Sequence, residues 1–271
     1  MSKVNKYADI VINHYKGYNE DERFNRNSHK VEFLTTMRYI EKFAKHGCKI
    51  LEIGAGTGAY SITLAKKGYV VTAVELVESN LEVMKRKAKR VKNIECLQGD
   101  ALDLSRFNDN TFDVVLNLGP MYHLYTTKDK NQAIRETIRV CKPNGICMFA
   151  YISCAAVVWD YGVRKYGFSD LVNLIDETGR IKDVPEEVFS TYFVDEFKKQ
   201  FNKTNTTYIT NVAVDSIASI CREYVNKMKN KDYLALLDWH FKTCEREDQQ
   251  GLSSHLLYIC KKNKEKLCKQ K

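Results

Sequence analysis

Proline is scarce in this chain, at three of 271 residues, and the sequence contains neither an internal repeat nor a low-complexity segment. These absences exclude collagen-like, proline-rich and repeat architectures. Hydrophobic residues make up 44% of the sequence and charged residues 28%, which is typical of a folded globular protein and not of a disordered one. A chain of this length can bury a full core, so we predict one domain over residues 1–271, and a two-domain arrangement is not required.

Long apolar runs are also missing. No stretch approaches the roughly 20 uninterrupted apolar residues that a membrane span needs, and the residues after Met1 do not lead into an apolar signal core. We therefore expect a cytoplasmic protein without a membrane partner, present as a monomer or a homodimer.

Cysteine is present, but it lacks the spacing of a disulfide framework or a zinc site. The nine cysteines are scattered and odd in number, and none belongs to a Cys-x-x-Cys pair or to a Cys/His cluster. We expect reduced, mostly buried thiols and no bound metal.

The formal net charge is +9, and a basic surface attracts polyanions such as nucleic acids. However, the segment 261–271 contains six lysines and one glutamate, so it supplies five of the nine charges. A solvated basic tail over 261–271 explains this distribution more simply. A nucleic-acid partner stays open but is not favoured.

Short β-rich runs alternate with amphipathic helical patterns through the first half of the chain. This rhythm predicts right-handed crossovers and a three-layer, doubly wound α/β sheet that is mostly parallel. Ligands of such sheets bind at the carboxyl ends of the strands. The predicted strands are 49–53, 69–74, 94–97, 112–117 and 146–151, and the predicted helices are 30–45, 60–67, 79–90 and 132–141.

The rhythm breaks after residue 152, which divides the chain into segments. We predict an N-terminal lid and first helix, a cofactor-binding half, a cap insertion, and a C-terminal half of the sheet that carries a helical insertion. The C-terminal half contains a helix near 193–201, a strand at 206–214, a long helical stretch at 216–246 and a last strand at 253–260. The segments are, in order, 1–45, 46–152, 153–192 and 193–260, followed by the basic tail.

A glycine-rich loop follows the first predicted strand. Gly54, Gly56 and Gly58 allow the backbone to turn sharply and bring amide groups close to a ligand at a helix N-terminus. Together with Ala59 these glycines also satisfy the dinucleotide pattern G-x-G-x-x-A. The loop alone therefore leaves an NAD-dependent oxidoreductase open.

Two acids distinguish the alternatives further. Glu75 ends the second predicted strand, where a carboxylate can accept hydrogen bonds from the hydroxyls of an adenosine ribose. Asp100 follows Gly99 at the end of the third strand, where it suits an acceptor for the amine of an adenine. Turns and helix caps would explain each residue singly. Their joint occurrence at the ends of consecutive strands favours a cofactor site.

With Glu52 before the first glycine, this set resembles the class I, Rossmann-like S-adenosylmethionine-dependent methyltransferases. The resemblance covers residues 46–152 and, more weakly, the final strands. It implies a seven-stranded sheet with an antiparallel last strand, and S-adenosylmethionine as cofactor with S-adenosylhomocysteine as product. It also implies cofactor contacts for Glu52, Gly54, Gly56 and Gly58 at the methionine end, Glu75 and Leu76 at the ribose, Asp100 and Ala101 at the adenine, and Asn117, Leu118 and the lid residue Tyr18.

The loop from Gly119 to Leu124 resembles a Gly-Pro-x-Tyr-His-Leu segment of bacterial small-molecule methyltransferases. It departs from the Asp/Asn-Pro-Pro-Tyr motif of enzymes that methylate amines of nucleic-acid bases, so the sequence does not support that activity. The resemblance places His123 beside the expected methyl group, as a base or substrate anchor; a histidine bonded to nearby backbone is the alternative. Further substrate candidates are Tyr122, Trp159 and His255, for which core packing or solvent exposure are the alternatives.

We therefore predict an enzyme that transfers a methyl group to a hydroxyl or amine of a small molecule. An RNA or protein methyltransferase, an NAD-dependent oxidoreductase and a non-catalytic cofactor-binding protein are the competing hypotheses. No motif encodes the acceptor, because insertions shape that pocket.

Overall fold

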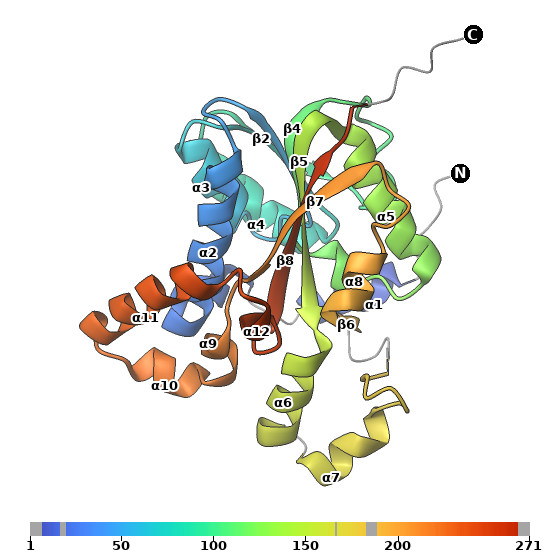
Figure 1. The fold of residues 1–271 in the computed structure, drawn as a ribbon. Coiled ribbons are helices and arrows are strands. Elements are labelled where there is room, and N and C mark those ends of the chain that lie inside the picture. The colour runs from blue at the N-terminus through green and yellow to red at the C-terminus, as the bar shows by residue number, and fades with distance from the viewer. Residues whose placement is uncertain (1–6, 17–19, 166, 183–188, 265–271) are drawn as a thin grey trace.

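The computed structural model describes residues 7–16, 20–165, 167–182 and 189–264 of the chain. A twisted sheet forms the middle layer, and helices cover both of its faces (Figure 1). A helical appendage extends beyond one end of the sheet, at the bottom of that view. Among the helices of the described residues, none combines the length and apolar character that a membrane crossing requires.

The sheet has the order β3-β2-β1-β4-β5-β8-β7, and β6 pairs with β5 beside this path. Neighbours from β3 to β5 are parallel, whereas β8 lies antiparallel between β5 and β7. The strands are β1 Lys49–Ile53, β2 Val70–Glu75, β3 Ile94–Gln98, β4 Phe112–Asn117, β5 Cys141–Ser153, β6 Thr191–Tyr192, β7 Thr206–Ala213 and β8 His255–Lys262.

The predicted fold class is confirmed, but the described residues form eight strands and not seven. The additional strand is β6, whose two residues pair in parallel with the end of β5, at Ile152 and Ser153. A strand of two residues has no alternation that a sequence pattern can reveal. It forms because the chain returns from the appendage to the sheet.

Helices occupy the intervals between the strands. The α-helices are α1 Ala8–Lys16, α2 Asn27–Phe43, α3 Ala59–Lys66, α4 Glu78–Ala88, α5 Thr127–Val140, α6 Cys154–Arg164, α7 Phe168–Leu171, α8 Val194–Lys199, α9 Ile217–Ile220, α10 Arg222–Lys227, α11 Asn230–Thr243 and α12 Glu247–Gln250. Three short 3₁₀ helices are η1 Glu20–Asn25, η2 Pro120–Tyr122 and η3 Val172–Leu174. The predicted stretch 216–246 is thus three helices.

Two apolar layers hold the helices to the sheet. On one face, residues of α5 and α8 pack on the central strands, with Phe197 and Tyr151 stacked at 3.8 Å between ring centroids. On the other face, α2, α3 and the end of α11 bury residues such as Ile40 and Leu64. The central strands are buried on both sides, so their sequences are nearly continuous apolar runs.

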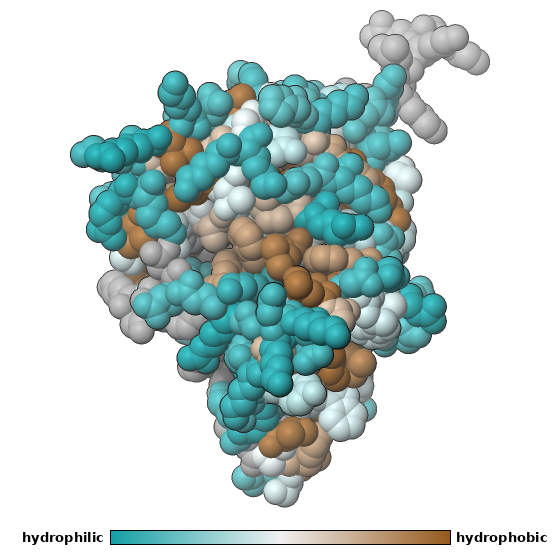
Figure 2. All heavy atoms as spheres, turned by 90° about the vertical axis from the view of Figure 1, so that its left-hand side faces the viewer, coloured by the Kyte–Doolittle hydropathy of each residue, from teal (hydrophilic) through white to brown (hydrophobic). Residues whose placement is uncertain are grey.

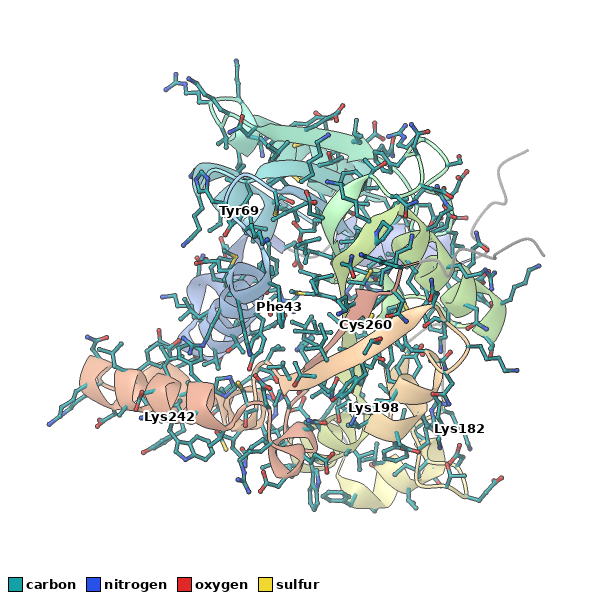
Figure 3. The ribbon with its side chains drawn as sticks, turned by 45° about the horizontal axis from the view of Figure 1, so that its top comes forward. Phe43, Tyr69, Lys182, Lys198, Lys242 and Cys260 are labelled. Atoms are coloured by element: carbon teal, nitrogen blue, oxygen red, sulfur yellow. The ribbon has the colours of Figure 1, made fainter. Side chains whose placement is uncertain are left out.

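The outer surface contrasts with these layers. Figure 2 shows a largely hydrophilic face over α2, α3 and α11, with apolar atoms gathered toward its middle. In Figure 3 Cys260 lies on β8 inside the molecule, whereas Lys242 lies on the outside of α11. The basic residues of this side therefore face solvent.

The helices after β7 support the start of α2. The side chain of Asn226, in α10, accepts a hydrogen bond from the Ser28 amide at 2.9 Å. The Tyr233 hydroxyl, in α11, donates to the Asn27 carbonyl at 3.0 Å. The first bond satisfies an amide of the kind that every helix leaves unpaired near its beginning, and the second joins α11 to the same turn of α2.

Candidate active site

A cavity lies at the carboxyl ends of β1, β2 and β4, where doubly wound sheets bind their ligands. It encloses about 1140 Å³ of empty space, part of which is open to solvent. One wall consists of the loops after these strands, and the facing wall comes from α1, η1, α2 and the start of β8. Segments from both ends of the chain therefore meet here.

The glycine loop forms the floor of this cavity after β1. Gly54, Gly56 and Gly58 all have positive φ values, of 75°, 54° and 84°, which L-residues with a side chain rarely adopt. A Cβ on Gly54 would lie 2.8 Å from Cδ of Pro120, so the loop packs directly against η2. A Cβ on Gly58 would lie 2.7 Å from Cγ of Met84.

The three predicted glycines thus divide into two kinds. Gly54 and Gly56 line the cavity. Gly58 instead caps the N-terminus of α3 and lets that helix approach α4. We therefore assign Gly58 to helix packing, a role that the spacing of a glycine-rich loop does not distinguish from ligand contact.

Glu75 holds the loop to the end of β2. Its Oε2 accepts a hydrogen bond from the Gly56 amide at 2.7 Å, and its Oε1 accepts from the Val77 amide at 2.8 Å. Burial raises the pKa of this carboxyl, and the amide donors partly oppose that shift. Both interpretations of Glu75 have support, because it lines the cavity beside Leu76 and also bonds the amide at the start of α4.

Asp100 and Ala101 line the far end of the cavity, after β3. The Asp100 Oδ1 accepts a hydrogen bond from the Leu102 amide at 2.9 Å, which closes a short turn. The structure brings these two residues to the same cavity as Gly54 and Glu75. This is the arrangement that the sequence predicted for an adenine site.

Glu52 and Asn117 lie within the strands β1 and β4, before the loops that line the cavity. Glu52 is 1% exposed, accepts a hydrogen bond from the Ser61 hydroxyl, and borders the cavity. Burial raises its pKa to about 8 even though the Ser61 hydroxyl opposes the shift. Asn117 is fully buried below the cavity, where its Nδ2 donates to Thr137 Oγ1 at 3.1 Å. Its neighbour Leu118 lines the cavity in its place.

We call the part of the cavity lined by Gly54, Glu75 and Asp100 the first half, and the part beside the loop after β4 the second half. Two aromatic residues of this loop face the second half. The Tyr122 hydroxyl donates to the Leu118 carbonyl at 3.0 Å, and burial raises its pKa to about 12. His123 is 8% exposed, and its Nε2 lies 3.1 Å from the Tyr15 hydroxyl of α1. The ring of His123 is thus bonded to a side chain that also lines the cavity.

A network of charged side chains occupies the same half. Nη2 of Arg23 lies 2.7 Å and 2.9 Å from the two carboxylate oxygens of Glu32, and Nη1 lies 3.5 Å from Glu20. Nη2 is also 3.4 Å from Nε2 of His255. Nδ1 of His255 lies 2.9 Å from Oδ2 of Asp215. Four of these residues line the cavity, and Asp215 supports His255 from behind.

The neighbouring carboxylates govern the protonation of the His255 imidazole. The surrounding protein lowers the pKa of the His255 imidazole, but the neighbouring Glu32 and Asp215 carboxylates outweigh this effect and hold the pKa above its ordinary value. Arg23 acts in the opposite direction. The imidazole is therefore a base of increased strength that faces the cavity.

The sequence analysis identified His255 but missed Glu20, Glu32 and Asp215. One signal was available for Glu32, because it shares the buried face of α2 with Thr35, Thr36 and Tyr39. An acid on the apolar stripe of a helix indicates a buried charge with a partner. Asp215 follows β7 in a turn and has no comparable signal.

Two predicted residues do not join the site. Trp159, on α6, is 52% exposed and contacts Phe168 at 5.7 Å between ring centroids, outside the set that lines the cavity. The interpretation of Trp159 as a substrate contact is therefore not retained; its aromatic character alone suggested a pocket wall. Tyr18 lies outside the described residues.

Known proteins resemble this chain most clearly over its first half. Residues 51–149 match a family model described as a methyltransferase domain. A Bacillus subtilis methyltransferase named YqeM is 34% identical over 113 residues, which cover 41% of this chain and 45% of that protein. Demethylmenaquinone methyltransferase of Staphylococcus carnosus is 33% identical over 169 residues, 60% of this chain and 66% of that enzyme. The chain thus spans about half to two thirds of the length of these relatives.

Solved structures resemble the chain over most of its length. A methyltransferase of Thermotoga maritima covers 95% of this chain and 100% of its own, with a TM-score of 0.59 and 15% identity. One from Methanosarcina mazei covers 83% of this chain and 97% of its own, with a TM-score of 0.54 and 16% identity. At these identities the likeness shows the fold alone.

Proposed function

We propose that the chain is a class I S-adenosylmethionine-dependent methyltransferase that transfers a methyl group to a small-molecule acceptor. The methyltransferase-domain match and the Staphylococcus carnosus relative support this proposal. The match over residues 51–149 supports the predicted family, and the solved structures support its fold. The activity of the whole chain and the class of its acceptor are proposals that rest on the cavity.

One observation carries the proposal. A single cavity joins the predicted cofactor residues, from Gly54 to Asp100, to a second half that holds Tyr15, Tyr122 and His123. A methyl donor in the first half and an acceptor in the second would lie side by side. The sulfonium methyl is already activated, so alignment of donor and acceptor supplies several kcal/mol toward the reaction.

The walls of the second half support a small acceptor. Its wall comes from α1, η1 and α2, which together cover the ends of the strands. The Staphylococcus carnosus relative is named for a small-molecule acceptor, demethylmenaquinone, which agrees with this size class. We propose His123 as an anchor for the acceptor, with its Nε2 3.1 Å from the Tyr15 hydroxyl.

Calorimetry with S-adenosylmethionine and with NAD separates methyl transfer from hydride transfer. We expect binding of the former and not of the latter. A second step incubates the protein with a metabolite extract and methyl-labelled cofactor, and mass spectrometry then detects small molecules that gain the label. NAD binding, or cofactor binding with no labelled product from any extract, would contradict the proposal.

A further inference from the structure

The ionisable groups that line the cavity are mostly acidic, whereas the chain as a whole has a net positive charge. The chain has 43 Lys and Arg residues against 34 Asp and Glu residues. Within the part of the chain that the structure describes, however, the cavity lining contains five carboxyl groups, one guanidinium and no lysine. The carboxyl groups belong to Glu20, Glu32, Glu52, Glu75 and Asp100, and the guanidinium to Arg23. Glu52 keeps its proton at neutral pH, because burial raises its pKa to about 8.

The cofactor accounts for only part of this imbalance. Glu52, Glu75 and Asp100 belong to the half that we assign to S-adenosylmethionine. Glu32 faces the other half, with Asp215 behind His255. Glu20 lies between the two halves, because its Cγ is 3.4 Å from where a Cβ of Gly56 would be and its carboxylate contacts Arg23. When the His255 imidazole is neutral, as a base must be, one guanidinium faces three carboxylates in a protein interior, where an unpaired charge is costly.

Glu20 lacks a closely placed positive charge among the described residues. Burial raises the pKa of Glu20 despite the guanidinium of Arg23, because the Arg23 Nη1 contact is long, at 3.5 Å, and the main partner of Arg23 is Glu32. A cation placed beside Glu20 would restore its ionised form. An anionic acceptor would meet repulsion from the same carboxylates.

We propose that the methyl acceptor is a basic amine that enters as an ammonium ion, binds beside Glu20 and Glu32, and gives a proton to His255. This inference rests on the proposed function and narrows its acceptor from hydroxyl or amine to amine. It also explains why a basic chain has an acidic cavity: the site would receive S-adenosylmethionine, whose sulfonium, α-ammonium and carboxylate sum to one positive charge, together with the ammonium of the acceptor.

His255 is placed to accept the proton. Asp215 Oδ2 lies 2.9 Å from Nδ1, so the hydrogen resides on Nδ1 and the lone pair on Nε2, the atom that lies 3.4 Å from Arg23. The imidazole is faced by Asp215, Glu32, Arg23 and Tyr122, and Glu20 and His29 are close enough to interact with it electrostatically. A carboxylate behind one ring nitrogen fixes the tautomer and stabilises the imidazolium that forms.

The chemical step balances with these groups alone. The ammonium loses one proton to Nε2 of His255 and becomes a neutral amine with a free electron pair. That pair forms a bond to the methyl carbon, and the electrons of the carbon–sulfur bond move to sulfur, which leaves as a thioether. The product is a methylated ammonium ion, and the imidazolium then returns its proton to water.

A metal ion is the competing occupant of this cluster. One ligand atom each from Glu32, Asp215 and His255 lie within 4.8 Å of one another. However, Arg23 already contacts both oxygens of Glu32, and Asp215 already holds Nδ1 of His255. An ammonium group can bind the remaining lone pairs without breaking those bonds, whereas a metal would have to displace the guanidinium.

The charge of the true acceptor tests the inference. A metabolite extract is separated at pH 7 into fractions retained by a cation exchanger, retained by an anion exchanger, or retained by neither. Each fraction is incubated with protein and methyl-labelled cofactor, with and without EDTA. We expect labelled product from the cationic fraction, independent of EDTA. Product from the anionic or neutral fraction only, or product that EDTA abolishes, overturns the amine site while the methyltransferase function stands; no product from any fraction overturns both.

Matched variants then test Glu20, with the active compound purified from that fraction and the cofactor saturating. We expect Glu20→Gln to raise KM for the acceptor about tenfold, the loss typical of a charge-assisted bond, with kcat within about threefold. Glu247→Gln removes the same charge from an exposed position on α12 and serves as control. If the Glu20→Gln variant melts at the same temperature as the wild type and its KM for the acceptor is unchanged, the role of Glu20 is overturned.

The proton transfer has a separate readout. We expect His255→Gln to lower kcat about a hundredfold at neutral pH while KM changes by less than about threefold, because general base catalysis acts on the reaction step and not on binding. We also expect kcat of this variant to recover as the pH approaches the pKa of the amine, where the acceptor loses its proton to water. A variant with wild-type kcat at neutral pH, or without recovery at high pH, overturns the role of His255.

Discussion

Glu52 provides a test in which replacing a titratable carboxyl by an amide is expected to make the protein more stable. Its carboxyl lies on β1, 1% exposed, with one hydrogen bond from the Ser61 hydroxyl. Burial raises its pKa from 4.5 to about 8. Glutamine has nearly the same shape as a protonated glutamate and can accept the same bond, so Glu52→Gln removes the titration and keeps the packing.

The sign follows from proton binding. Between pH 4.5 and about 8 the folded chain keeps a proton on Glu52 that the unfolded chain has lost, so the wild type loses stability as the pH rises through this window. The loss is about 1 kcal/mol at pH 5, about 3 kcal/mol at pH 7 and close to 5 kcal/mol above pH 8. The Glu52→Gln variant lacks this loss, so the two proteins diverge with pH.

Thermal unfolding of the two cofactor-free proteins measures the difference. All other titrating groups are the same in the two proteins. The change with pH, from 5 to 8, in the difference between the melting temperatures of variant and wild type therefore reports the titration of Glu52 alone. We expect the variant to melt higher by about 5 °C or more at pH 7, since about 1 kcal/mol shifts the melting temperature of a chain of this size by roughly 2 °C. Glu82→Gln, on the exposed side of α4, is the control. A difference between variant and wild type that stays constant from pH 5 to pH 8 would refute the reasoning.

Two further variants test the cofactor half. Asp100→Ala should weaken S-adenosylmethionine binding about tenfold by calorimetry, because an adenine amine would lose its acceptor; unaltered affinity would undo this assignment. Gly58→Ala should destabilise the fold by about 2–4 kcal/mol in denaturant titration, because alanine at φ 84° is strained and its Cβ would meet Met84 at 2.7 Å. Gly47→Ala, at φ 74° with nothing described within 4 Å of its Cβ, is the control and should lose only about 1 kcal/mol; equal losses in the two variants would contradict the packing role of Gly58.

The alternating half of the chain was predictable from sequence because each of its elements is long enough to show its own period. The parallel order and the placement of Glu75 and Asp100 at strand ends follow from that alternation. The break of 216–246 into three helices was not predictable. It depends on where Asn226 and Tyr233 meet the beginning of α2, a contact between residues about 200 positions apart.

The acceptor half was predictable only in part, for a similar reason. His123 follows a strand and carries a motif, so its sequence neighbours indicate its place. Glu32 and Asp215 gain their roles only through His255, and separations of 223 and 40 residues leave no local pattern. Trp159 illustrates the converse: a large aromatic residue suggests a pocket, but its helix extends away from the sheet and exposes the ring.

The position of β8 between β5 and β7 has a consequence for the order in which the molecule is completed. β8 is the last strand of the chain, yet it lies inside the sheet and begins with His255. The strands and loops that surround the cofactor half, from β1 to β4, all precede it in synthesis. On a ribosome the chain can therefore assemble a place for the methyl donor well before the imidazole opposite Glu32 exists. A chain stopped short of β8 would retain its donor loops and lack the residue that we assign to the acceptor.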